Sequence, residues 1–200
     1  MLNIKSKVSE NKQIKKENLL ASAYELFIRK GVNDTSISDI TDNAKVAKGT
    51  FYLYFIDKWD IYEKLIIERS RLLFEEALIN INNTNITNFE EKIIILADYI
   101  INTFKNNIDL LKFIGKNLSL GIYNNLTYEE YNYQYNNIKE NFEKELQTYN
   151  KKIKDPSSIL FIIIQLISST CYDTILNCFP TNIDSFKDIL FEQVKKIISQ

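Results

Sequence analysis

The feature that most constrains the fold is the helical spacing of apolar residues in a chain with few helix breakers. The 200 residues include only 4 glycines and 2 prolines. Hairpin dipeptides and the alternating apolar pattern of strands are scarce. Because 45% of the residues are hydrophobic, a chain of this length can bury a sizeable core. We therefore predict an all-α fold.

Local signals indicate where the helices begin and end. Gly31 can adopt the left-handed conformation that ends a helix, and Ser36 followed by Asp39 resembles a capping box. Asp57 stands at an N-cap position, and the pair at 155–156 supplies an N-cap aspartate and a proline at the first helical position. The expected helices cover residues 13–30, 36–43, 47–53, 57–79, 87–104, 110–121, 127–149, 156–177 and 183–198.

Residues 35–58 have the pattern of two short helices joined by a tight turn. Apolar residues fall where a small three-helix core needs them, at Ile40, Val46, Phe51 and Phe55. The pattern predicts a helix-turn-helix, whose second helix can enter the DNA major groove, about 12 Å wide. Charge agrees with this weakly, because residues 1–60 carry 10 Lys+Arg against 8 Asp+Glu and the rest of the chain carries 15 against 18.

The polar residues of this segment are left for its outer surface. They are Lys48, Thr50, Tyr52, Tyr54 and Lys58. Lysine ammonium and tyrosine hydroxyl groups suit phosphate oxygens, and a threonine offers a hydroxyl to phosphate or a methyl group to thymine. The glycine at position 49 would let the helix backbone approach DNA closely. The alternative interpretation is a plain helical subdomain with an aromatic core.

Roughly residues 13–67 resemble the DNA-binding head of the TetR family of transcriptional repressors. The resemblance is carried by LFIRKG at the end of the first helix, TSISDIT at the start of the second, and KGTFYLYF followed by Lys58. It implies an all-helical homodimer with a C-terminal ligand domain. It also implies phosphate and base contacts from a set of residues in the head. These are Ser36, Lys48, Gly49, Thr50, Tyr52, Tyr54 and Lys58.

Two positions depart from the family pattern, which usually has glycine in the turn and serine at the cap of the recognition helix. This chain has Lys45 and Ala47 there. Loss of a side-chain cap typically costs about 1 kcal/mol, so we expect the third helix to fray in the absence of DNA. Lys45 would add a phosphate contact instead.

The rest of the chain predicts a helical body for ligand binding and dimerisation. We expect a head over residues 1–56 and a linker helix plus body over 57–200. The last two helices are strongly apolar, which predicts a homodimer seam between them and the same helices of a partner. Aromatic residues at helical spacing either form plain core or line a cavity for an aromatic or lipophilic effector. Those considered for ligand binding are Tyr99, Phe104, Phe113, Tyr123, Tyr131 and Tyr135.

The composition disfavours most enzyme and metal-site classes. The chain has no histidine, and it lacks a phosphate-binding glycine loop, a serine elbow and a cysteine pair at metal-ligand spacing. We expect no cofactor, no metal and no catalytic residues. The first 16 residues are polar, so we expect no secretory signal, and the apolar run at 159–167 is too short to span a membrane. We therefore expect a cytoplasmic location.

We predict a repressor that binds a pseudo-palindromic double-stranded DNA operator as a dimer and is released by a small effector. One alternative is a ligand- or protein-binding module of the same fold without operator binding. A second is a helical enzyme that uses carboxylates or tyrosines.

Overall fold

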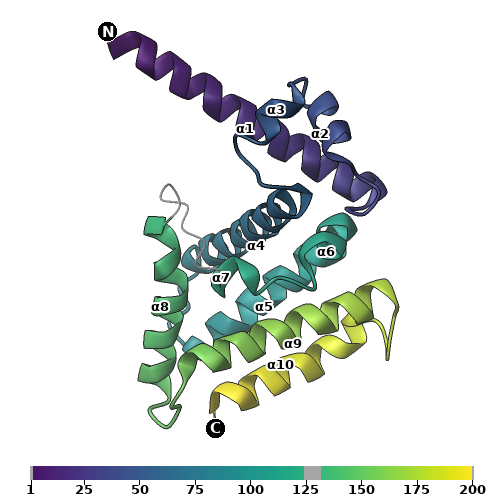
Figure 1. The fold of residues 1–200 in the computed structure, drawn as a ribbon. Coiled ribbons are helices and arrows are strands. Elements are labelled where there is room, and N and C mark those ends of the chain that lie inside the picture. Colours follow the sequence, from purple (N-terminus) through teal and green to yellow (C-terminus); the bar gives the residue numbers. More distant parts are fainter. Residues whose placement is uncertain (1, 124–131, 200) are drawn as a thin grey trace. The chain divides into compact units, whose positions relative to one another are not determined.

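The computed structural model describes the backbone of residues 2–123 and 132–199, and side chains over residues 11–123 and 138–199. In the described part of the chain every regular element is a helix, as the sequence predicts (Figure 1). The helices are α1 (Leu2–Lys30), α2 (Ile37–Asn43), α3 (Lys48–Phe51), α4 (Lys58–Asn82), α5 (Phe89–Asn106), α6 (Ile108–Ile114), α7 (Leu120–Tyr123), α8 (Asn132–Tyr149), α9 (Pro156–Leu176) and α10 (Ile183–Ser199). The chain divides into two compact units, Met1–Leu65 and Ile66–Gln200, called the head and the body below.

The head is built from α1, α2, α3 and the first two turns of α4. Three of the four expected core residues, Ile40, Phe51 and Phe55, are buried, whereas Val46 is only half-buried. The helix α1 is longer than expected and begins at Leu2 rather than near residue 13, because no glycine or proline interrupts the chain before position 31. Fully buried α1 side chains complete the core, and these include Leu19 and Ala23.

The boundary between the two units lies nine residues beyond the expected position, at 65/66 instead of 56/57. The reason is that the start of α4 packs into the head. Ile61 and Leu65 are fully buried, and the ring of Tyr62 meets that of Phe27 edge-on with centroids 5.7 Å apart. The helix α4 therefore contributes residues to both units.

The body is organised around α9, which packs against α5, α6, α8 and α10. The helices α5 and α10 run antiparallel, and ion pairs join the start of each helix to the end of the other. Glu90 binds Lys195 at 3.1 Å, and Lys105 binds the carboxylate at position 184 at 2.5 Å. Between them Asp98 binds Lys187. These pairs fix how α10 lies along α5.

The helix α9 is long and apolar enough to cross a membrane by length and composition, although the expected apolar run within it is shorter. Its buried residues include Leu160, Ile163, Ile167 and Cys171, which pack within the body. A core helix that is covered on several faces has the same composition as a membrane span. We therefore interpret α9 as the central core helix of the body.

One helix start and the division of one helix differ from the sequence-based expectation. Asn88, not Thr87, caps α5, because its side-chain oxygen accepts from the backbone N–H of Glu91 at 3.1 Å. The expected helix 110–121 is divided into α6 and α7, and a Cβ placed on Gly121 would lie 2.5 Å from the Cβ of Ser70. This close approach to α4 requires glycine at position 121, which lies within α7. The expected start at residue 127 lies outside the described residues.

Candidate nucleic-acid interface and ligand cavity

The start of α2 is fixed by a polar cluster at Ser36. The Ser36 hydroxyl accepts from the backbone N–H of Asp39 at 3.0 Å, and the Asp39 carboxylate accepts from the backbone N–H of Ser36 at 2.7 Å. This is the capping box that the sequence predicts. Lys30 donates to the same carboxylate at 2.8 Å, and this bond, with those from Ser36, holds the Asp39 pKa well below its usual range.

The turn between α2 and α3 contains both departures from the family pattern. Lys45 has φ 55°, the left-handed region in which a side chain is disfavoured and glycine is not. Ala47 is the N-cap residue of α3, and no side-chain hydrogen bond caps that helix. The four-residue α3 is correspondingly shorter than the expected 47–53.

One face of α3 is held in the core while the other is open. Phe51 is fully buried, and its ring centroid lies 5.4 Å from that of Phe55. Lys48 and Gly49 are exposed, and Tyr52 is 55% exposed just after the helix. A Cβ on Gly49 would meet no atom within 4 Å, so the absence of a side chain there leaves open space beside the helix.

The other residues that the sequence assigns to DNA contact differ in their exposure and in their hydrogen bonds within the head. Lys45 is exposed and Thr50 is half-buried. The Tyr54 hydroxyl donates to the Lys12 carbonyl oxygen at 2.9 Å, and the Lys58 ammonium donates to the Asn33 carbonyl oxygen at 3.0 Å. With Ser36 engaged in the capping box, these three polar groups have bonds inside the head. Their contacts with DNA stay predictions.

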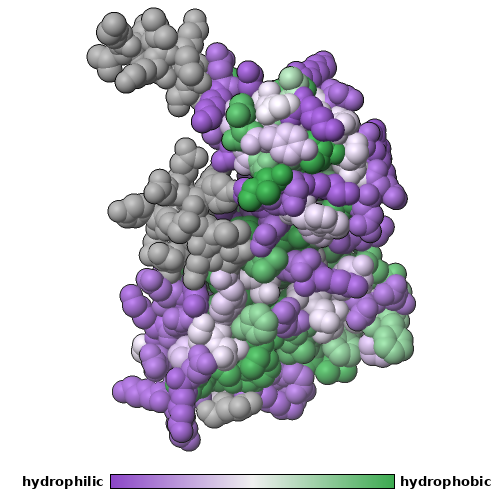
Figure 2. Space-filling view, in the orientation of Figure 1, coloured by the Kyte–Doolittle hydropathy of each residue, from purple (hydrophilic) through white to green (hydrophobic). Residues whose placement is uncertain are grey.

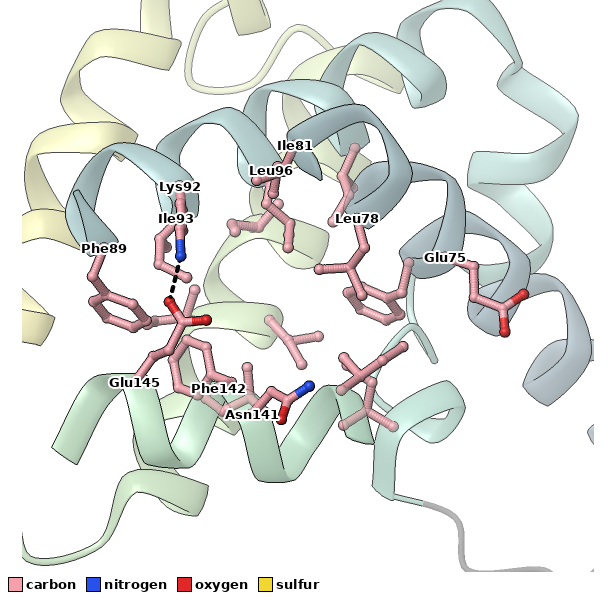
Figure 3. A pocket seen from close by; sticks show the side chains of 18 of the residues that line it. Glu75, Leu78, Ile81, Phe89, Lys92, Ile93, Leu96, Asn141, Phe142 and Glu145 are labelled. Carbon is pink, nitrogen blue, oxygen red and sulfur yellow. Dashed lines mark hydrogen bonds and ion pairs between the residues drawn. The ribbon is translucent and has the colours of Figure 1, made fainter. Parts of the chain in front are cut away.

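The body contains a partly open cavity of about 480 Å³ (Figure 3). Its walls come from α4, α5, α7, α8 and α9. Most of the lining is aliphatic, for example Leu78, Ile93, Leu96, Ile163 and Ile167. Phenylalanines also contribute, at positions 74, 89 and 142. A cavity of this size and lining suits a small lipophilic molecule.

Charged groups lie at the edge of this cavity. Lys92 of α5 and Glu145 of α8 point toward each other across the space between their helices, with Nζ 2.8 Å from Oε2 (Figure 3). Glu75 of α4 also lines the cavity and is paired with Arg71 one turn earlier at 3.4 Å. Among the lining residues that the structure describes, Lys92 is the one basic side chain.

The aromatic residues considered for ligand binding lie elsewhere where the structure describes them. Phe104 and Phe113 are buried, and neither lines the cavity. The Tyr99 hydroxyl donates to Glu76 at 3.4 Å, and the Tyr123 hydroxyl donates to the Ser157 carbonyl oxygen at 2.5 Å. Neither tyrosine lines the cavity. Tyr131 and the side chain of Tyr135 lie outside the described residues. The sequence gives no signal for the aliphatic lining, because isoleucine and leucine occur throughout the core.

The two cysteines occupy different environments. Both thiols are free, and Cys171 is buried in α9 whereas Cys178 is exposed beyond the end of that helix. Burial raises the pKa of the Cys171 thiol to about 12, so this thiol stays protonated at neutral pH. Within the described residues, no group of three or more histidine, cysteine, aspartate or glutamate side chains is arranged to hold a metal ion.

The head matches a known family of bacterial regulators. Residues 19–65 match the family described as bacterial regulatory proteins, tetR family. This range includes the capped α2, the turn at Lys45 and the exposed face of α3. The head of the chain therefore matches the TetR family.

Curated relatives share mainly the head with this chain. The transcriptional repressor BepR of Brucella suis is 36% identical over 64 residues, which are 32% of this chain and 30% of BepR. The uncharacterised regulator YdgC of Bacillus subtilis is 29% identical over 107 residues, which are 52% of this chain and 54% of YdgC. The matched part thus spans from under a third to about half of these relatives.

Solved structures of TetR-family proteins extend the likeness to the whole fold. A putative regulator from Syntrophomonas wolfei has a TM-score of 0.63 at 21% identity, with 95% of this chain and 97% of that chain covered. FadR of Bacillus subtilis, solved in complex with stearoyl-CoA, has a TM-score of 0.60 at 19% identity, with 90% and 97% covered. At these identities the likeness establishes the fold.

Proposed function

We propose that this chain is a ligand-responsive DNA-binding transcriptional regulator that represses by binding a pseudo-palindromic operator as a homodimer. The observation that carries the proposal is the geometry of α3. Phe51 anchors the helix in the core, and this leaves Lys48, Gly49 and Tyr52 on an open face. A short helix presented in this way can enter the major groove, with its first turn near base edges and its polar neighbours at phosphates.

The exposed polar groups around α3 would divide between gripping and reading the operator. Lys45 and Lys48 are exposed cations that suit phosphate oxygens, and Tyr52 offers a hydroxyl at the surface. Thr50 is half-buried, so only the exposed part of its side chain, the methyl or the hydroxyl group, would be available to contact a base in the groove. Lys58 would contact phosphate with the N–H donors that its bond to Asn33 leaves unused. The hydroxyl groups of Ser36 and Tyr54 already donate to Asp39 and to the Lys12 carbonyl oxygen, so each would reach a phosphate by exchanging that bond.

The dimer would form through α9 and α10. Both helices expose apolar side chains, including Phe161, Ile162 and Ile189, and apolar surface is visible over this part of the body in Figure 2. Pairing with the same two helices of a second copy would bury these side chains in a four-helix arrangement. Two heads would then occupy successive major grooves, about 34–36 Å apart.

The helix α4 provides a physical link between a ligand and the head. Its first turns bury Ile61 and Leu65 in the head core, and its later turns contribute Phe74 and Leu78 to the cavity wall. A ligand that fits one conformation of the cavity better would shift α4, and with it the separation of the heads. Operator affinity would then fall by the ratio of the ligand affinities of the two states.

The experiment that tests the proposal is a gel-shift titration with the DNA upstream of the chain's own gene. We expect saturable binding that weakens steeply as the salt concentration rises, because phosphate contacts release counterions. Lys112→Ala is a matched control, since this exposed lysine lies on α6 in the body. Binding that is absent, or equal for random DNA of the same length, would contradict the proposal.

A second function is favoured by the turn before α3. The strained φ of Lys45 and the missing cap at Ala47 both weaken the presentation of the recognition helix. A module of the same fold that binds a ligand or a protein without operator binding would tolerate both. Retained ligand binding in the absence of any DNA sequence preference would support this alternative.

A further inference from the structure

We infer that the cavity of the body takes an amphiphilic anion, with its apolar tail among the aliphatic side chains and its anionic head on Lys92. The inference rests on the ligand binding proposed above. It goes further by naming the chemical class of the ligand and the residue that selects it. Figure 3 shows the arrangement on which it depends.

The interior of the cavity suits an aliphatic tail. Side chains such as Leu96, Ile163 and Ile167 supply branched aliphatic surface around a volume of about 480 Å³. A flexible hydrocarbon chain can adapt to such a lining without hydrogen bonds. An unpaired polar group placed at this depth would lose its bonds to water, so the polar part of the ligand must lie at an edge.

The charged edge provides the place for the polar head. In the described part of the lining, two carboxylates, Glu75 and Glu145, accompany one cation, Lys92. Glu75 is already paired with Arg71 on its own helix. The pair between Lys92 and Glu145 is different, because it joins two helices across the cavity. A ligand head can enter by replacing one member of this pair.

The relative exposure of the two members indicates which one is replaced. The side chain of Lys92 is 28% exposed, whereas that of Glu145 is 46% exposed. The more exposed carboxylate can return to water with a smaller loss of contacts, while the more buried ammonium needs a partner where it is. An anionic head therefore takes the place of Glu145 on Lys92. A cationic head would have to displace the more buried group.

Replacement of Glu145 would also alter how α5 and α8 are held together. The two helices would still be joined by Phe89, whose ring packs against those of Phe142 and Tyr149 with centroids 5.5 and 5.4 Å apart, and by the Tyr149 hydroxyl, which donates to Glu90 at 3.2 Å. The ligand would exchange an ion pair between helices for one between α5 and itself. This gives the ligand a direct effect on the position of α8.

The test uses three ligands of equal tail length that differ only in the head: decanoate, decanol and decylammonium. Calorimetric titration into the full chain, without DNA, measures the affinity of each. We expect decanoate to bind about tenfold more tightly than decanol, in line with a hydrogen bond to a charged group, and decylammonium to bind most weakly. Equal affinities, or the tightest binding by decylammonium, would overturn the inference.

Two variants assign the preference to the proposed residues. Lys92→Met keeps the length of the side chain and removes its charge, so decanoate affinity should fall about tenfold while decanol affinity stays the same. Glu145→Gln removes the competing carboxylate and should raise decanoate affinity severalfold. Lys144→Met is the matched control, since Lys144 is exposed on α8 and does not line the cavity. A Lys92→Met variant that melts like the wild type and binds both ligands equally less well would contradict the role of Lys92 in selection.

These measurements involve no DNA, so they separate the inference from the proposed function. Decanoate binding without any operator binding would support the inference while the proposed function fails. Operator binding that persists in a chain to which decanoate does not bind would show the reverse.

Discussion

The head and the body differ in the kind of contact that defines them. The head depends on a few specific polar and aromatic contacts, such as the Lys30, Asp39 and Ser36 cluster and the Phe51 and Phe55 ring pair. The body has ion pairs between α5 and α10 but depends mainly on aliphatic contacts around α9, and it still contains a cavity. We therefore expect substitutions in the head to change its stability through single identifiable contacts. Those in the body should act through volume and shape.

The largest expected effects compare one buried phenylalanine from each unit. Phe51 in the head and Phe104 in the body are both 0% exposed, and replacement of either by alanine should cost about 3–5 kcal/mol. Denaturant titrations should follow Trp59 fluorescence, which reports the head, and circular dichroism, which reports both units. Phe51→Ala should shift the fluorescence transition most, and Phe104→Ala the circular dichroism transition.

The control for this pair is Tyr52→Ala, which removes a half-exposed ring next to Phe51 and should cost far less stability. If Phe104→Ala left stability unchanged but weakened ligand binding, Phe104 would be a ligand residue, as one reading of the sequence holds. This result would contradict the proposed difference between the head and the body.

The next effect concerns the open face of the head. Lys48→Ala should lower operator affinity about tenfold and reduce the slope of log affinity against log salt by about one, because one phosphate contact is lost. The dimer should stay intact in size-exclusion chromatography. Tyr52→Ala should weaken operator binding as well. Unchanged affinity in both variants would count against the proposed interface.

A smaller effect tests the strained turn. Lys45→Gly should raise stability by about 1 kcal/mol, because φ 55° disfavours a side chain and suits glycine. The same variant should weaken operator binding, since it removes an exposed cation. Lys48→Gly is the matched comparison and should lower stability, because position 48 is helical. A stability loss in Lys45→Gly would show that the lysine side chain has a structural role.

The smallest effect is expected from restoring the missing cap. Ala47→Ser offers a hydroxyl to the unpaired N–H groups of α3 and should add about 0.5 kcal/mol, at the low end for caps. Ser36→Ala at the start of α2 is the opposite change and should cost about 1 kcal/mol. Fluorescence-detected thermal melting of the two variants should therefore shift in opposite directions.

The pattern of the sequence was sufficient for the all-α class, the caps at Ser36 and Asp155, and most of the head core. These features depend on neighbours within one or two turns. The N-terminal extension of α1 and the break between α6 and α7 were not predicted. The need for glycine at position 121 depends on how closely α7 approaches Ser70, which is distant in sequence.

The candidate site was only partly predictable for the same reason. Exposure of Lys48 and Tyr52 follows from helical spacing, but the bonds of Tyr54 to Lys12 and of Lys58 to Asn33 depend on where α1 and its following turn lie. The cavity is harder still, because it forms where faces of several helices converge. Aromatic residues drew attention in the sequence, yet the lining is mainly aliphatic.

The most direct test of the central claim is selection of DNA bound by the full chain from a random pool, repeated with decanoate present. We expect enrichment of a pseudo-palindrome whose half-sites are one helical turn apart, about 34–36 Å, and loss of the selected DNA when the ligand is added. Absence of any enriched sequence, at a salt concentration where the chain is a stable dimer, would contradict the claim that the head is an operator-binding domain.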